Sequence, residues 1–223
     1  MKSSKCFLVI SFFTLIISCK QADEVPYYGI DFLFKASQPI DDREVNHFPN
    51  RFIGNYMNQD STNLVIENKT VYYKWTTKSN ISFSAFDSIK DSQRVFENRI
   101  YFDNEFVEFR KLKDSIEITD SNYDTIFSIS SFQKVKRVKN SIVFNTKDSI
   151  YWKIKILTLD DYNKLTLKTI VSDEDLIRMD SLSKIKAQKI DSTKIIVQLS
   201  KKEFKKMLTL KRFGYDQNFK KID

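Results

Sequence analysis

The chain has 223 residues, with 37 basic and 29 acidic side chains, a net charge of +8 and 41% hydrophobic residues, which is enough for one domain with a buried core or two small ones. It has only three glycines and three prolines, and this scarcity argues against a glycine loop that cradles phosphate, where close backbone approach requires glycine. Both cysteines lie within the first 19 residues, so the rest of the chain has no thiol for a disulfide.

The N-terminal segment has the three zones of a secretory signal: two lysines, an apolar run at residues 7–17, and a small residue before a cysteine. The run is too short to cross the roughly 30 Å of bilayer hydrocarbon as a helix. Ile16-Ile17-Ser18-Cys19 resembles the bacterial lipobox, in which the cysteine is diacylated and becomes the mature N-terminus. This resemblance implies a signal peptide at residues 1–18 and lipidation at Cys19. The alternatives are an ordinary signal peptide and an N-terminal anchor helix.

Residues 19–50 are predicted to form the lipidated N-terminus and a tether. Gln21-Ala22-Asp23-Glu24 resembles a short acidic signal that follows the lipidated cysteine in surface-exposed lipoproteins of the Bacteroidota, although a soluble spacer would look the same. A short helix is expected at Asp41-Asp42-Arg43-Glu44-Val45.

Residues 51–223 are predicted to form a β-rich globular domain with C-terminal helices. Short β-branched and aromatic runs with period two predict about ten antiparallel strands between Asn63 and Ile170, arranged as a meander, a sandwich or a barrel-like sheet. Asn68-Lys69 and Asp103-Asn104 are expected to be two-residue hairpin turns.

One local device recurs in this region: Asp followed by Ser or Thr, whose side chains stabilise a turn before a strand begins. In the strand after Asp148-Ser149, alternation places Ile150, Trp152, Ile154 and Ile156 on one face and Tyr151, Lys153 and Lys155 on the other. The device occurs at Asp87-Ser88, Asp114-Ser115, Asp124-Thr125 and Asp148-Ser149.

Two helices are expected late in the chain. The first begins near Ser172 with acids in its first turn, where the helix dipole favours them. The second begins with the capping box Ser200-Lys201-Lys202-Glu203, buries Phe204, Met207 and Leu208, and ends near Gly214. The expected fold class is therefore mainly β with two late α-helices, α+β overall.

The positive charge is concentrated at the end of the chain. Residues 184–223 contain twelve basic and four acidic residues, a net charge of +8. Such a face can meet an anionic envelope component or an acidic protein, and its alternative is a solvated helix face. The candidate residues are Lys202, Lys205, Lys206, Lys211 and Arg212.

No catalytic or metal-binding set stands out. The only histidine, His47, has no histidine or cysteine partner for zinc, and neither Asp160-Asp161 nor Asp173-Glu174-Asp175 has the ligand spacing of a calcium loop. Trp75 and Trp152 are expected in the core, with a ligand cavity as the alternative. We therefore predict no enzyme activity, no cofactor, no metal and no nucleic acid.

Much of residues 50–223 is similar to uncharacterised lipoproteins of the Bacteroidota, on Phe52-Ile53-Gly54-Asn55-Tyr56, Ile126-Phe127-Ser128-Ile129, Tyr151-Trp152-Lys153 and the C-terminal helix. The first of these segments also resembles the first strand of lipocalin-like barrels. The resemblance implies a lipoprotein anchored to the outer membrane, on its periplasmic or cell-surface side, that acts as a binding or structural module. The alternatives are an immunity or inhibitor lipoprotein that neutralises a toxin and a lipocalin-like carrier of small ligands.

Overall fold

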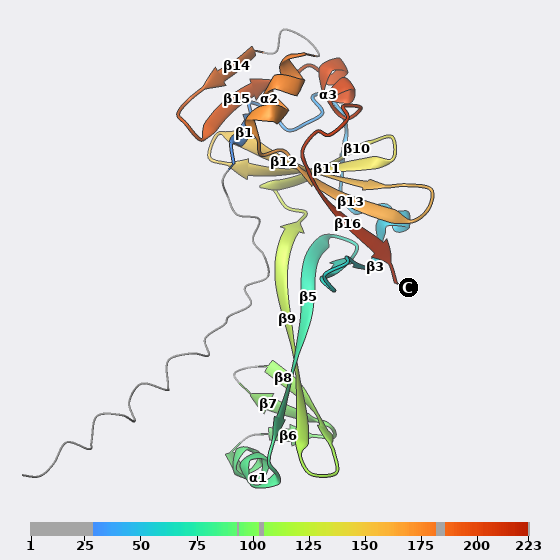
Figure 1. Cartoon of the computed structure of the whole chain (residues 1–223), viewed down its shortest axis with the longest axis vertical. Helices are drawn as coiled ribbons and strands as arrows, with labels where there is room; N and C mark the ends of the chain where they lie inside the picture. The colour runs from blue at the N-terminus through green and yellow to red at the C-terminus, as the bar shows by residue number, and fades with distance from the viewer. Residues whose placement is uncertain (1–28, 93, 103–104, 182–185, 223) are drawn as a thin grey trace, which may run out of the picture.

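The computed structural model describes residues 29–92, 94–102, 105–181 and 186–222. Within these ranges the chain forms sixteen β-strands and three α-helices, and hydrogen bonding links all the strands into one sheet. The molecule has a larger body and a slender arm that ends in a small lobe (Figure 1). The expected mainly β fold class is confirmed.

The strands follow β-branched and aromatic runs, which favour extended backbone. They are β1 (Asp31–Phe34), β2 (Glu44–Val45), β3 (Gly54–Met57), β4 (Asn63–Ile66), β5 (Thr70–Ile81), β6 (Arg94–Phe96), β7 (Arg99–Phe102), β8 (Glu105–Lys111), β9 (Ile116–Ser128), β10 (Gln133–Val138), β11 (Ser141–Asp148), β12 (Tyr151–Leu159), β13 (Lys164–Thr169), β14 (Lys186–Lys189), β15 (Lys194–Gln198) and β16 (Tyr215–Lys221). The helices are the 3-10 helix η2 (Asn50–Phe52) and the α-helices α1 (Phe83–Ser92), α2 (Asp173–Asp180) and α3 (Lys201–Met207).

Strand β12 is central to the body because it buries side chains on both faces. Ile154 and Ile156 belong to a helix-side core, in which they join residues of β1, β15, α2 and α3. Leu157 and Leu159 belong to a sheet-side core formed between strands. The predicted alternation along this strand is confirmed, except that Ile150 lies in the preceding turn and is exposed.

The sheet-side core fills the inside of a curl of strands. Their hydrogen-bonded order is β10-β11-β12-β13-β16-β3-β4-β5-β9, with antiparallel neighbours throughout. The first and last of these strands contribute side chains to the same core, and Phe127 of β9 stacks on Phe144 of β11 with ring centroids 4.5 Å apart. The sheet therefore encloses an apolar interior.

The globular fold begins earlier than predicted, at β1, so a tether that reaches residue 50 is wrong. β1 pairs in parallel with β15, from Asp31↔Lys194 to Phe34↔Val197, and Phe34 is fully buried. The expected helix at residues 41–45 is also wrong. Its last two residues instead form β2, which pairs with β10, because Val45 packs against the sheet-side core.

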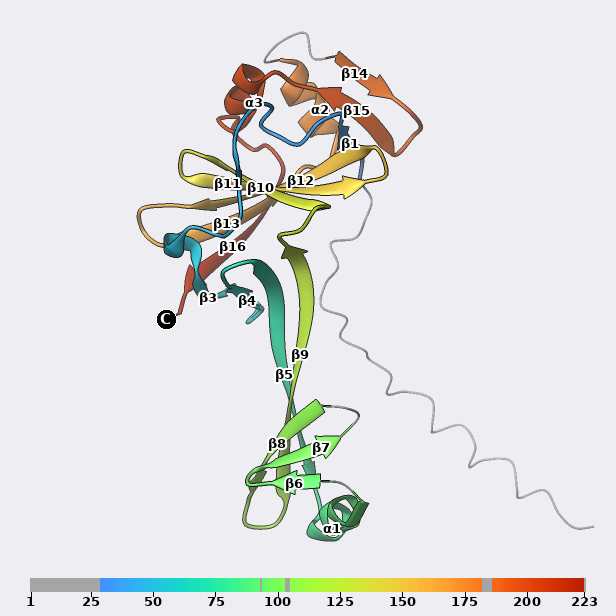
Figure 2. The same cartoon turned by 180° about the vertical axis from the view of Figure 1, so that it is seen from behind.

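The arm is a two-stranded ribbon of β5 and β9, paired from Thr70↔Ser128 to Ile81↔Ile116. At its far end β6, β7, β8 and the start of β9 form a small sheet that packs on α1 (Figure 2). This lobe has a small core of its own around Phe86, Ile100 and Ile116.

Helix α1 was not predicted, because Asp87-Ser88 was interpreted as a turn before a strand. Phe83, Phe86 and Ile89 recur every three residues and face the core of the lobe, and the Ser82 hydroxyl accepts a hydrogen bond from the Ala85 amide at 3.2 Å. The helical period therefore outweighs the local turn signal.

The other turn predictions have mixed outcomes. Asp114-Ser115 and Asp148-Ser149 do precede β9 and β12, whereas Asp124-Thr125 lies inside β9 beside a register shift. Asn68-Lys69 connects β4 to β5 as predicted, with a hydrogen bond from the Glu67 amide to the Thr70 carbonyl at 2.9 Å. Asp103-Asn104 lies outside the described residues. The ten described strands β4 to β13 match the predicted number.

Both late helices begin at the predicted capping boxes, on Ser172 and Ser200. The second ends at Met207, earlier than predicted, so Gly214 does not stop it. Gly214 has a positive φ of 71°, and a Cβ atom there would lie 2.8 Å from the Thr169 carbonyl oxygen. Close approach to β13 therefore requires this glycine.

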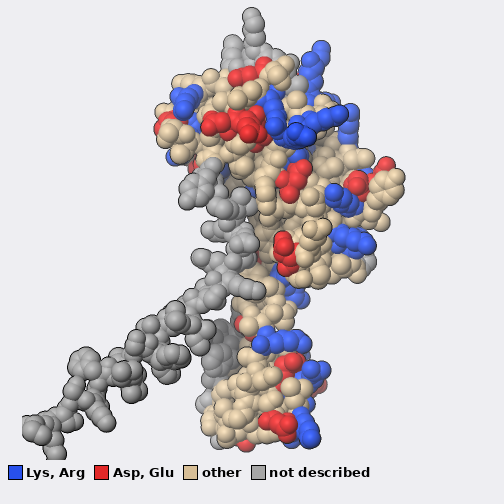
Figure 3. Space-filling view, viewed as in Figure 1, with Lys and Arg blue, Asp and Glu red and all other residues tan. Residues whose placement is uncertain are grey.

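Basic side chains are prominent on the upper part of the body in the region of α3, and both charge signs occur along one side of the lobe (Figure 3). None of the helices in the described part of the chain has both the length and the apolarity that crossing a membrane requires.

Candidate functional site

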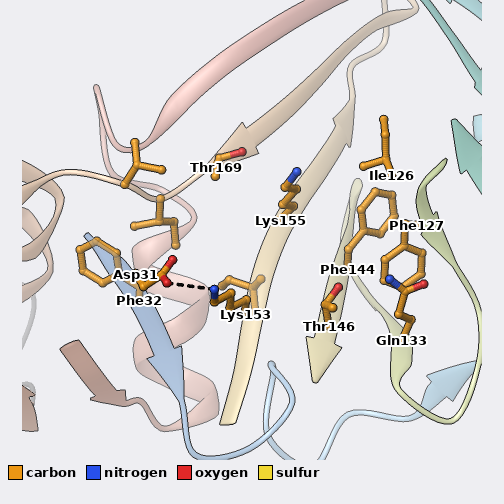
Figure 4. Close-up of a pocket in the computed structure, with 13 residues that line it drawn as sticks. Asp31, Phe32, Ile126, Phe127, Gln133, Phe144, Thr146, Lys153, Lys155 and Thr169 are labelled. Atoms are coloured by element: carbon orange, nitrogen blue, oxygen red, sulfur yellow. Dashed lines mark ion pairs between the residues drawn. The ribbon is translucent and has the colours of Figure 1, made fainter. Parts of the chain in front are cut away.

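A pocket of about 310 Å³ lies at one end of the sheet-side core. The residues that line it come from β1, β9, β10, β11, β12 and the end of β13 (Figure 4). Seven of the thirteen are apolar, and the others include Asp31 and two lysines from β12. The lining residues are Asp31, Phe32, Ile126, Phe127, Gln133, Phe144, Thr146, Lys153, Ile154, Lys155, Thr169, Ile170 and Val171.

The pocket exists because two strands share one edge of β12. Near its start, β12 pairs with β1 through Phe34↔Trp152, and from Lys155↔Thr169 onward it pairs with β13. β1 then continues the sheet toward β15, whereas β13 continues it toward β16. The sheet therefore branches at residues 153–155 of β12, which line the pocket.

Lys153 is held by two carboxylates. Its Nζ lies 2.9 Å from Asp31 Oδ2 and 3.0 Å from Asp148 Oδ2. Burial alone would lower the pKa of Lys153, but the hydrogen bonds that its ammonium donates to these two carboxylates, together with their charges, outweigh burial and raise the pKa. The ion pair of Lys153 with Asp31 therefore connects β12 to β1, and Lys153 remains positively charged.

Lys155, two residues further along the same face, makes no hydrogen bond or ion pair within the described residues. Its side chain points into the space between Thr169 and Ile126 (Figure 4). Solvent reaches the Lys155 side chain through the pocket, but the surrounding protein partly desolvates its ammonium and lowers its pKa. The negative charge of Asp124 acts in the opposite direction and is the smaller effect. The pocket therefore presents one uncompensated cation.

The rest of the wall is mainly apolar and firmly held. Phe127 and Phe144 are almost fully buried members of the sheet-side core, and Ile126 extends this wall toward Lys155. Gln133 is fixed because its side-chain oxygen accepts a hydrogen bond from the Ser128 amide at 2.7 Å. Such a pocket offers an apolar wall beside one lysine that has no carboxylate partner in the described chain, which suits an amphiphilic anion.

The predicted basic face is exposed but separate from this pocket, since none of its members lines it. Lys202, Lys205 and Lys206 project outward from α3, and Phe204 and Met207 beneath them are fully buried, as predicted. Lys211 and Arg212 lie in the turn after the helix and not on its last turn. The predicted lipidation site, Cys19, lies outside the described residues.

The residues weighed for chemistry are not brought together. His47 is exposed, with its Nδ1 2.6 Å from Asn46 Oδ1, and Asp160 caps the β12–β13 turn by accepting from two backbone amides. In the described ranges, no three His, Cys, Asp or Glu side chains are grouped to hold a metal. The core prediction is wrong for Trp75, which is 44% exposed on the arm, whereas Trp152 packs against the helix-side core.

Sequence reasoning placed Lys155 on the strand face opposite Ile154 and Ile156 and did not predict this pocket. A signal was present, because Lys153 and Lys155 share the face on which Leu157 and Leu159 are buried. When the residues on one face of a strand change from lysine to leucine along its length, that face runs from the protein surface into the core.

Comparison with known proteins finds no family model, no curated protein and no solved structure that matches the chain.

Proposed function

We propose that this protein is a lipoprotein of the outer membrane, anchored through Cys19, that binds a small amphiphilic anion and is not an enzyme. The anchor rests on the lipobox-like Ile16-Ile17-Ser18-Cys19. The binding function rests on one observation: Lys155 has no ion-pair partner in the described chain, and it lies in a pocket with otherwise largely apolar walls.

An anion fits this pocket better than a neutral ligand of the same shape. The unpaired ammonium of Lys155 is reached by solvent but is partly desolvated, and a carboxylate or sulfonate at hydrogen-bonding distance would offset that unfavourable effect. An apolar body would then lie along Ile126, Phe127 and Val171. The volume is near the lower limit of small-molecule sites, about 300 Å³, which favours a compact or short-chain ligand.

We test this proposal by calorimetry of the chain from Lys20 onward, using decanoate as the probe and decanol as its neutral analogue. Decanoate should bind more tightly than decanol, and Lys155→Met should remove that preference, a loss of about tenfold or more in affinity for decanoate. Lys147→Met, which removes an exposed lysine on the neighbouring β11, is the matched control and should change neither affinity.

The pH dependence of decanoate binding gives an independent readout. Binding needs protonated Lys155, so affinity should be constant at neutral pH and fall as pH rises through the lysine pKa. Burial lowers that pKa from its ordinary 10.5, so the fall should begin at a lower pH than for an exposed lysine. Equal binding of decanoate and decanol, or an unchanged affinity in Lys155→Met, would overturn the proposed function.

A further inference from the structure

The lobe at the end of the arm has one covered and one open sheet face. On the covered face, alternate residues of β6 to β9, such as Val95, Ile100 and Phe109, pack against α1. The residues between them point the opposite way, and most of them are exposed. We call this opposite side the open face; it comprises Lys78, Arg94, Phe96, Arg99, Tyr101, Phe106, Glu108, Arg110, Glu117 and Thr119.

The open face carries large aromatic side chains that solvent reaches. Phe96 is 59% and Phe106 55% exposed. Tyr101 packs edge-on against Phe106 with ring centroids 5.0 Å apart, and the Arg99 guanidinium lies 5.6 Å from the Phe106 ring centroid. Aromatic residues and arginine together are the composition of protein-binding hot spots.

The open face also has a surplus of positive charge. Glu117 is paired with Lys78 at 3.4 Å and with Arg110 at 3.1 Å. Among the side chains that the structure describes, none forms an ion pair with Arg94 or Arg99. An open hollow of about 570 Å³, lined in part by Glu108, Arg110 and Glu117, lies on the same face.

We propose that the open face docks a protein whose surface presents carboxylates next to apolar side chains. The carboxylates would pair with Arg94 and Arg99, and the apolar groups would cover Phe96 and Phe106. Glu108 and Glu117 lie among these residues, so a partner must place its carboxylates beside the arginines and away from the two glutamates. A folded protein surface can do this, whereas the closely repeated phosphates of a nucleic acid or a lipid surface would also meet the glutamates. The arm holds this face away from the body, where a partner can reach it (Figure 2). The proposal is independent of the pocket.

The test uses a defined acidic polypeptide, a fluorescein-labelled random copolymer of glutamate and tyrosine, and measures its anisotropy with the chain from Lys20 onward. The double variant Arg94→Gln/Arg99→Gln should weaken binding about tenfold, and Phe106→Ala should also weaken it. The matched control is Lys205→Gln/Lys206→Gln, which removes two exposed positive charges from the body and should leave binding within about twofold. Circular dichroism checks that each variant is folded.

Competition separates the candidate partners. Excess unlabelled copolymer should displace the probe, whereas a single-stranded oligonucleotide and phosphatidylglycerol vesicles should not. Equal weakening by the two double variants would show non-specific attraction between charges and overturn the proposal. Displacement by the oligonucleotide or the vesicles, or no binding at all, would overturn it as well.

Discussion

At the scale of single residues, Asp175 is a buried carboxylate, only 2% exposed, that joins three separate segments of the body. Its Oδ2 accepts hydrogen bonds from the amides of Val171 at 3.1 Å and Ser172 at 3.2 Å, and its Oδ1 accepts one from Gly214 at 2.7 Å. One carboxylate therefore joins the end of β13, the start of α2 and the loop before β16.

Replacing this carboxylate should destabilise the whole body. Asp175→Ala leaves three partly buried amides without their acceptor, and we expect it to lower the free energy of unfolding by about 3 kcal/mol. Urea unfolding followed by circular dichroism measures the change. The control is Asp173→Asn on the exposed first turn of the same helix, which should cost no more than about 1 kcal/mol. Equal losses in the two variants would contradict this role for Asp175.

At the scale of elements, α3 shows how a short helix is fixed by its capping box and two buried side chains. Ser200 and Glu203 satisfy each other's backbone amides, and Phe204 and Met207 enter the helix-side core with no exposed surface. The helix owes its position to this apolar face, since its outward face is solvated lysine.

Phe204→Ala should therefore lower the free energy of unfolding by about 3–5 kcal/mol. Lys205→Glu and Lys206→Glu should change it by less than about 0.5 kcal/mol, because exposed charges contribute little to stability. Denaturant titration measures the free energy of unfolding of the three variants. A lysine variant that costs as much as Phe204→Ala would show that the outward face is structural.

The elements also show which parts of the fold a sequence reveals. Local devices were found correctly, such as the capping box at Ser200 and the turn at Asn68-Lys69, because each acts within a few residues. The parallel partner of β1 was missed, since β15 lies more than 160 positions later. The pocket was missed for the same reason: Lys155 becomes a wall residue only where two distant strands share one edge of β12.

At the scale of the whole molecule, the proposed anchor at Cys19 would decide where the pocket and the arm operate. If Cys19 carries acyl chains, Cys19→Ala should release the protein from the membrane fraction or leave it unprocessed. Fractionation and mass spectrometry of the N-terminal peptide test this. An N-terminal peptide without acyl chains in the unaltered protein would contradict the proposed anchoring.

The pairing of β1 with β15 also affects the order in which parts of the fold can form. Phe32 of β1 lies beside Ile195 of β15. β1 is synthesised early and β15 late, so β1 gains its parallel neighbour only after most of the chain has been made. Asp31 meets Lys153 only when β1 is in place, and the pocket is completed at that late stage. A nascent chain that is passed through a secretion channel N-terminus first must stay unfolded during transit. If residues 1–18 are a secretion signal, as we propose, this topology would favour such a delay, because β1 cannot pair with β15 until nearly the entire polypeptide has emerged.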